Sequence, residues 1–152
     1  MLFVECYADE TLMRTLGVQR RDLRHANGKG NVLNRLSRLN AGTGLVDEDS
    51  GASQPSELKN YREADQFGGL ILMAHRDNSK RRIIVVRPRL EEWLLDRAKA
   101  QGVNPSSFGL PDSSDRLHAF PRYDRTPKFP DFLRRLKELD PEMKRLSEWI
   151  CK

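Results

Sequence analysis

The stretch Arg82-Ile83-Ile84-Val85-Val86-Arg87 is the strongest strand signal in this chain. Four β-branched residues follow one another without a polar interruption, which is typical of a strand whose two faces are both covered. Pro88 ends the run, and the segment 89–100 that follows has apolar residues at helical spacing, namely Leu90, Trp93, Leu94 and Ala98. A fully buried strand followed by an amphipathic helix predicts an α/β fold with a mostly parallel central sheet flanked by helices.

The N-terminal half alternates strand-like and helix-like segments. Short apolar segments at 2–6 and 44–46 predict strands, and the segment 22–26, whose periodicity is weak, predicts another between them. The periodic segments 10–16 and 31–39 predict the helices between them, with Asp9 as the N-cap of the first helix. The resulting order is βαβαβ. After a loop-like stretch over 52–61, residues 69–75 predict a further strand that precedes the buried run.

The C-terminal third is different in composition. Prolines recur through 103–128, which predicts an ordered connector with little regular structure, and the segments 130–139 and 141–151 predict two helices. A chain of 152 residues has the size of one ordinary domain. We therefore expect residues 1–100 to form the α/β core and residues 101–152 to pack on the same domain.

Composition excludes a few classes of protein and permits others. Lys and Arg number 27 against 22 Asp and Glu, a net charge of +5 that is compatible with a polyanionic partner. No apolar run approaches the roughly 20 residues of a membrane span, and Glu5 interrupts the N-terminal run too early for a signal peptide. Cys6 and Cys151 lie at opposite ends of the chain and belong to no CxxC pair. We expect a cytoplasmic protein with reduced thiols and no membrane partner.

Acidic residues follow two of the predicted strands. Asp47 and Asp49 come directly after the strand at 44–46, and alternation places both on one side of an extended chain. Glu5 lies near the end of another strand, and the carboxyl ends of parallel strands meet at one edge of a sheet. Three such carboxylates suit Mg²⁺ or Mn²⁺. A solvated loop with aspartates in turn positions explains the same residues equally well.

These motifs resemble a known family. Val4-Glu5-Cys6-Tyr7-Ala8-Asp9-Glu10 before a helix, and Val46-Asp47-Glu48-Asp49 at a later strand end, look like the two motifs of the TOPRIM fold. The similarity is greatest to the branch found in OLD-family nucleases and related bacterial anti-phage defence proteins. Asp9 matches a second acid of the first motif, whereas Cys6 stands where glycine is usual. The resemblance covers about residues 2 to 95, and the C-terminal third has no part in it.

The resemblance implies a nuclease, or another phosphodiester-processing enzyme, that depends on Mg²⁺ or Mn²⁺. Glu5, Asp47 and Asp49 would be the catalytic metal ligands, and Asp9 and Glu91 would be further ligands. The nucleic acid, DNA or RNA, would be contacted by Lys29, Arg87 and Arg89. The role of Lys29 is also supported without the resemblance, because Lys29 lies at the start of a predicted helix, where free backbone N–H groups favour binding of a phosphate.

Two alternatives stay open. The chain could be a non-catalytic nucleic-acid-binding or regulatory module of the same fold, acting with a partner ATPase, since relatives in this branch are frequently joined to one. It could also be an acidic-loop metal protein unrelated to nucleic acid. His25, His75 and His118 are far apart in sequence and form no metal-binding pair, so we assign no role to them.

Overall fold

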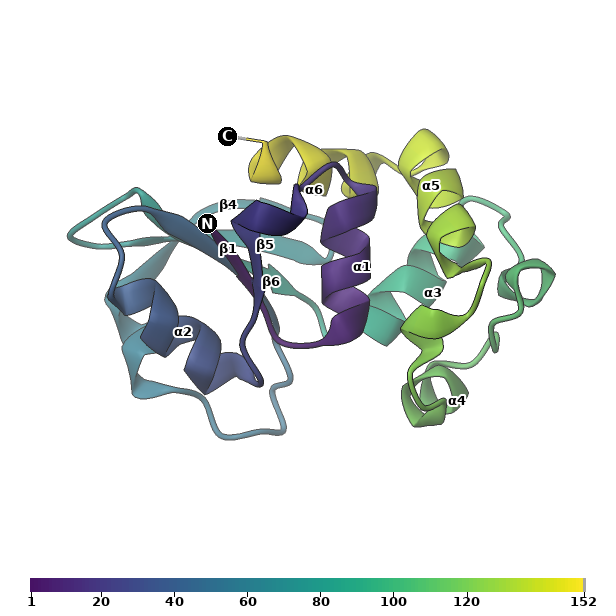
Figure 1. Ribbon diagram of the computed structural model, residues 1–152, viewed down its shortest axis with the longest axis horizontal. Coiled ribbons are helices and arrows are strands. Elements are labelled where there is room, and N and C mark those ends of the chain that lie inside the picture. Colours follow the sequence, from purple (N-terminus) through teal and green to yellow (C-terminus); the bar gives the residue numbers. More distant parts are fainter. Residues whose placement is uncertain (152) are drawn as a thin grey trace.

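The computed structural model describes residues 1–151 as an α/β fold built on one six-stranded sheet (Figure 1). The strands lie in the order β2-β1-β3-β6-β5-β4. Four neighbouring strands, β2, β1, β3 and β6, run parallel, while β5 is antiparallel to β6 and forms a hairpin with β4. The bounds are Leu2–Val4 for β1, Leu23–His25 for β2, Gly42–Asp47 for β3, Tyr61–Phe67 for β4, Leu70–His75 for β5 and Arg81–Val86 for β6.

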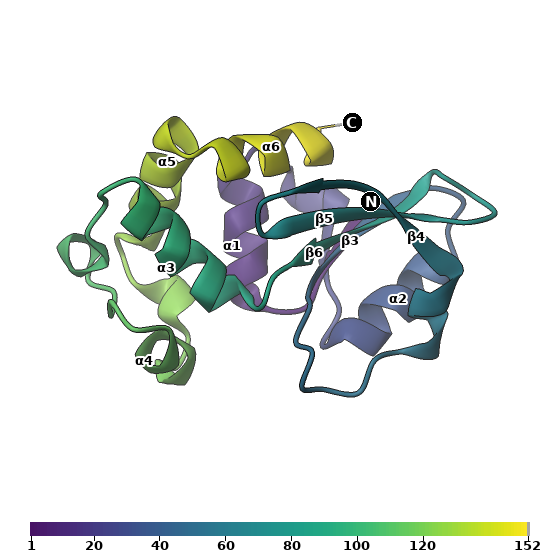
Figure 2. The same cartoon turned by 180° about the vertical axis from the view of Figure 1, so that it is seen from behind.

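Helices cover both faces of the sheet, because successive strand residues point to opposite sides. Phe3, Val46 and Val85 pack in one cluster with the residues of α2, whereas Leu2, Val4, Leu45 and Ile84 join a larger cluster with α1, α3, α5 and α6. Figures 1 and 2 show α2 apart from the other helices. The helices span Tyr7–Thr15 (α1), Lys29–Ser37 (α2), Leu90–Ala100 (α3), Ser114–Ala119 (α4), Phe129–Leu139 (α5) and Pro141–Ile150 (α6).

The predicted α/β class and the mostly parallel sheet are confirmed, and the structure differs from the sequence-based expectation in three places. Residues 61–67 form strand β4, whereas the sequence predicts a loop over 52–61 and no regular element between that loop and the strand at 69–75. Its side chains between Arg62 and Gln66 are exposed, so hydrophobic periodicity is missing; pairing with β5 forms the strand, and an edge position tolerates the charges. Residues 114–119 form helix α4 inside the expected irregular connector.

The third difference concerns Asp9. Helix α1 begins at Tyr7 with Cys6 in the N-cap position, so Asp9 lies inside the first turn and not at the cap. Cys6 has extended backbone angles, which let the chain leave β1 and enter the helix without a side-chain cap. The early start turns Asp9 toward the interior, where it is 1% exposed.

The C-terminal helices share a core with the sheet. Phe129 and Phe132 of α5 and Trp149 of α6 belong to the same buried cluster as Leu2 and Val4 of β1. At the start of α6, the Glu142 carboxylate accepts hydrogen bonds from the Gly69 N–H (2.7 Å) and from the Trp93 indole (3.2 Å), and it forms an ion pair with Arg97. Within residues 1–151, no helix combines the length and the apolar composition that crossing a membrane requires.

Candidate acidic site at the carboxyl edge of the parallel strands

The parallel register brings the ends of β1 and β3 side by side. Val4 is paired with Leu45, so Glu5 and Asp47, which follow them, meet at the same edge. The Glu5 Oε2 atom accepts a hydrogen bond of 2.7 Å from the backbone N–H of Asp47. Burial raises the pKa of Glu5, and the hydrogen bond from Asp47 and the charge of Lys29 oppose that shift. The sequence prediction that these two acids lie together is therefore matched by a direct contact.

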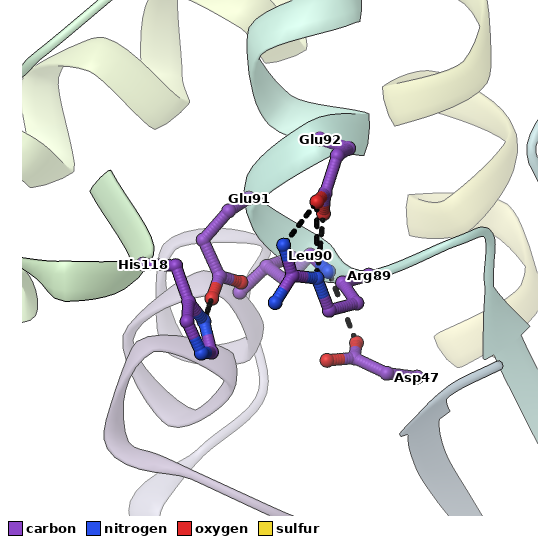
Figure 3. A network of polar contacts seen from close by, with 6 residues as sticks. All are labelled: Asp47, Arg89, Leu90, Glu91, Glu92 and His118. Atoms are coloured by element: carbon purple, nitrogen blue, oxygen red, sulfur yellow. Dashed lines mark hydrogen bonds and ion pairs between the residues drawn. The ribbon is translucent and has the colours of Figure 1, made fainter. Parts of the chain in front are cut away.

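Asp47 links this edge to helix α3. Its Oδ1 atom accepts a hydrogen bond of 3.1 Å from the N–H of Leu90, the first residue of α3 (Figure 3). This N–H is one of the donors that a helix start leaves without an internal partner. Burial, with the negative charges of Asp9, Glu5 and Glu91, raises the pKa of Asp47 to about 9. Its carboxylate is thus surrounded by three other acids.

Asp9 is the most deeply buried of these acids. It lies in the first turn of α1, and its Oδ1 atom has no hydrogen-bond partner among residues 1–151. Burial raises its pKa to about 7; the charges of Glu5 and Glu91 act in the same direction, and a hydrogen bond involving Cys6 opposes them. A buried carboxylate oxygen without a partner is costly, and it is usually explained by strain, function or an ion.

Glu91 completes the acid cluster, which we define as Glu5, Asp9, Asp47 and Glu91. It is 8% exposed, and its Oε1 atom lies 2.5 Å from Nδ1 of His118 on α4 (Figure 3). The His118 side chain is itself 57% exposed. Tyr123 is close enough to feel the charge of the cluster: burial, followed by the charge of Glu91, raises its pKa well above the usual range. Neither His118 nor Tyr123 has a sequence signal, since both reach the cluster only through the packing of the C-terminal third.

Asp49 and Lys29 line a hollow beside the cluster. This hollow of about 410 Å³ also borders Glu5, Asp47 and Gln54. Asp49 is exposed, with a positive φ of 40°. Lys29 opens α2, and its Nζ atom donates to the Glu48 carbonyl (2.8 Å) and to Gln54 Oε1 (2.6 Å). Burial lowers the pKa of Lys29, while the charges of the nearby acids, first Glu5 and then Asp49, raise it.

Arg87 and Arg89, the other expected nucleic-acid contacts, already have acidic partners. Arg87 forms an ion pair of 2.7 Å with Glu48, and Arg89 is paired with Glu92 one helical turn along α3. Both pairs lie close to the cluster, because Arg87 follows β6 and Arg89 precedes α3. Any phosphate that these arginines bind therefore competes with a carboxylate.

The donor set of the cluster suits a hard cation, since every candidate atom is a carboxylate oxygen. The unpartnered Asp9 oxygen agrees with that chemistry. The present side-chain positions do not form a ready-made site: among residues 1–151, no group of three or more His, Cys, Asp and Glu side chains has the arrangement that holds a metal ion. Glu5, Asp47 and Glu91 each hold a hydrogen bond to the protein instead. Binding one ion through three of these residues would require side-chain rotation.

Comparison of the chain with protein-family models, with curated proteins and with solved structures finds no significant match.

Proposed function

We propose that this chain is a divalent-metal-dependent phosphodiesterase of TOPRIM type that acts on DNA or RNA. The observation that supports the proposal most strongly is the convergence of four carboxylates, from the end of β1, the first turn of α1, the end of β3 and the first turn of α3. Buried like charges repel one another, so such a cluster is retained only with protons or a cation to neutralise it. Perturbed acids of this kind gather at functional sites.

Within this proposal, Glu5, Asp47 and Asp49 hold the ion, and Asp9 and Glu91 supply further oxygen atoms. A bound Mg²⁺ or Mn²⁺ would polarise the phosphate and lower the pKa of a water molecule. Lys29 faces the hollow next to Glu5 and Asp47, where its ammonium group and the free N–H groups at the start of α2 orient a phosphate. Because Asp9 and Asp47 have raised pKa values, we expect metal binding near pH 7 to release protons.

Titration calorimetry with Mn²⁺, run beside cleavage of single- and double-stranded DNA and RNA, tests this function. The test variant is Asp47→Asn, whose amide oxygen still accepts the Leu90 N–H while the charge is lost. The control is Glu63→Gln, which removes one charge from an exposed position on β4. We expect saturable Mn²⁺ binding and cleavage in the parent and in the control, with both at least about tenfold weaker in Asp47→Asn. Equal Mn²⁺ affinity in all three proteins would contradict the proposal.

The second candidate is a nucleic-acid-binding module without catalysis that acts with a partner ATPase. One observation favours it: three acids of the cluster are hydrogen-bonded to protein groups, and no three His, Cys, Asp or Glu side chains in residues 1–151 are arranged to hold a metal ion. Under this alternative, an oligonucleotide binds equally well to the parent and to Asp47→Asn, and neither protein cleaves it with Mn²⁺ present.

A further inference from the structure

Beside the acid cluster, the Tyr7 ring has two planar neighbours from distant parts of the chain, His25 and Arg122. The ring centroids of Tyr7 and His25 are 4.4 Å apart with the ring planes tilted by 49°, and the guanidinium carbon of Arg122 lies 3.8 Å from the centre of the Tyr7 ring. We call Tyr7, His25 and Arg122 the rim stack. Tyr7 is 45% exposed and the Arg122 side chain 38%, so the group is open to solvent and does not belong to the core.

We propose that the rim stack binds an unpaired base, so that the nucleic acid taken by this site is single-stranded. The inference rests on the proposed phosphodiesterase function and adds the strand state of its substrate. Single-strand-binding proteins combine cationic groups with aromatic platforms, and stacking tolerates any base because every base has an exposed π-face once it is unpaired. A duplex hides these faces between its own base pairs.

The stack is joined to the acid cluster on each of its three segments. Tyr7 follows Glu5 by two residues at the start of α1. The His25 ring, at the end of β2, lies 2.9 Å from the Glu5 carbonyl oxygen through Nε2. Arg122 precedes Tyr123, a buried ring whose pKa is raised first by burial and then by the charge of Glu91. A base held on the stack would therefore place the adjoining phosphate next to the carboxylates.

Arg122 adopts a backbone conformation that is unusual for a long side chain. Its backbone is left-handed, with φ 49° and ψ 49°, a region that glycine occupies without steric cost and that a long side chain rarely adopts. Asp49, on the hollow beside the cluster, is the other non-glycine residue with positive φ in residues 1–151. The Arg122 guanidinium is also fixed by two hydrogen bonds of 2.9 Å to Asp124, which hold its plane over Tyr7.

Fluorescence anisotropy of a labelled 12-nucleotide single strand and of the matching hairpin duplex, in EDTA to prevent cleavage, tests the proposal. Tyr7→Leu removes the platform, and Arg122→Gly removes the cation while relieving the left-handed backbone. Arg116→Gln, at an exposed position on α4, controls for the loss of one positive charge. We expect both test variants to bind the single strand about tenfold more weakly or worse, with duplex affinity changed no more than in the control.

The melting temperature separates binding from folding. We expect Arg122→Gly to melt within about 2 °C of the parent, because removing a left-handed non-glycine residue offsets the lost surface contact. Unchanged single-strand affinity in Arg122→Gly, or equal losses for single strand and duplex, overturns the proposal, as does a parent protein that binds neither. If the parent cleaves with Mn²⁺ but the variants bind the single strand as tightly as the parent, the rim stack does not bind a base and the proposed phosphodiesterase function still stands. Stack-dependent binding without cleavage would refute the phosphodiesterase instead.

Discussion

Replacing Asp9 by asparagine removes the most deeply buried charge of the acid cluster and keeps the shape of the side chain. The folded protein holds the Asp9 proton up to about pH 7, whereas the ordinary value is 3.8. Between these values the unfolded chain has released the proton and the folded protein retains it. The unfolded state therefore binds fewer protons, and the free energy of unfolding falls as pH rises through this window.

The magnitude follows from the width of the window. Each pH unit between about 4 and 7 lowers the free energy of unfolding by about 1.4 kcal/mol. Raising the pH from 5 to 7 should therefore lower the stability of the parent by about 3 kcal/mol, and Asp9→Asn should not show this loss. Above pH 7 the difference levels off. In a chain of this length, 3 kcal/mol corresponds to about 6 to 12 °C in melting temperature. Asp9→Asn should thus melt higher than the parent at pH 8, with a gap much larger than at pH 5.

Thermal unfolding followed by circular dichroism, at four pH values from 5 to 8.5 in EDTA, measures this difference. Glu10→Gln is the matched control, since Glu10 is the other acid in the first turn of α1 and is partly exposed. It should follow the parent within about 0.5 kcal/mol at every pH. Parallel melting curves of the parent and Asp9→Asn across the pH range would refute the reasoning, because they would mean that the Asp9 environment does not penalise its charge.

Three further outcomes follow from other contacts. Arg97→Met leaves the carboxylates of Asp140 and Glu142 without their cation, so urea denaturation should give a free energy of unfolding about 3 kcal/mol lower; an unchanged midpoint would show that the buried pairs are dispensable. Gly68→Ala should lose at least about 2 kcal/mol in the same assay, because its φ is +56° and a Cβ would lie 2.3 Å from Glu142 Cδ; stability equal to the parent's would contradict that geometry. His118→Ala should weaken Mn²⁺ binding about tenfold in calorimetry, with partial recovery in His118→Asn, whose amide can donate to Glu91; full affinity in His118→Ala would mean that this histidine does not position the carboxylate.

Much of the fold could be read from local pattern. The run Ile83 to Val86 predicts a strand covered on both faces, and its residues indeed alternate between the two buried clusters. Placing Glu5 and Asp47 at one edge needed only the rule that parallel strands end together, and the two residues are in contact. Strand β4 was not predicted because most of its side chains are exposed, and helix α4 was not predicted because it has only six residues. Both depend on packing against other parts of the chain.

The sequence by itself determined the α/β class, the strand ends and the presence of acids there, because hydrophobic period and turn residues are properties of adjacent positions. Only the tertiary structure decided which acids became buried and what surrounds them. An aspartate is usually found on the surface. Asp9 is buried because α1 begins two residues before it and turns this side chain toward the interior. His118 meets Glu91, and Arg122 meets Tyr7, across 27 and 115 residues of chain. Such contacts depend on how the C-terminal third folds back over the sheet, and therefore on the free energy of the whole core.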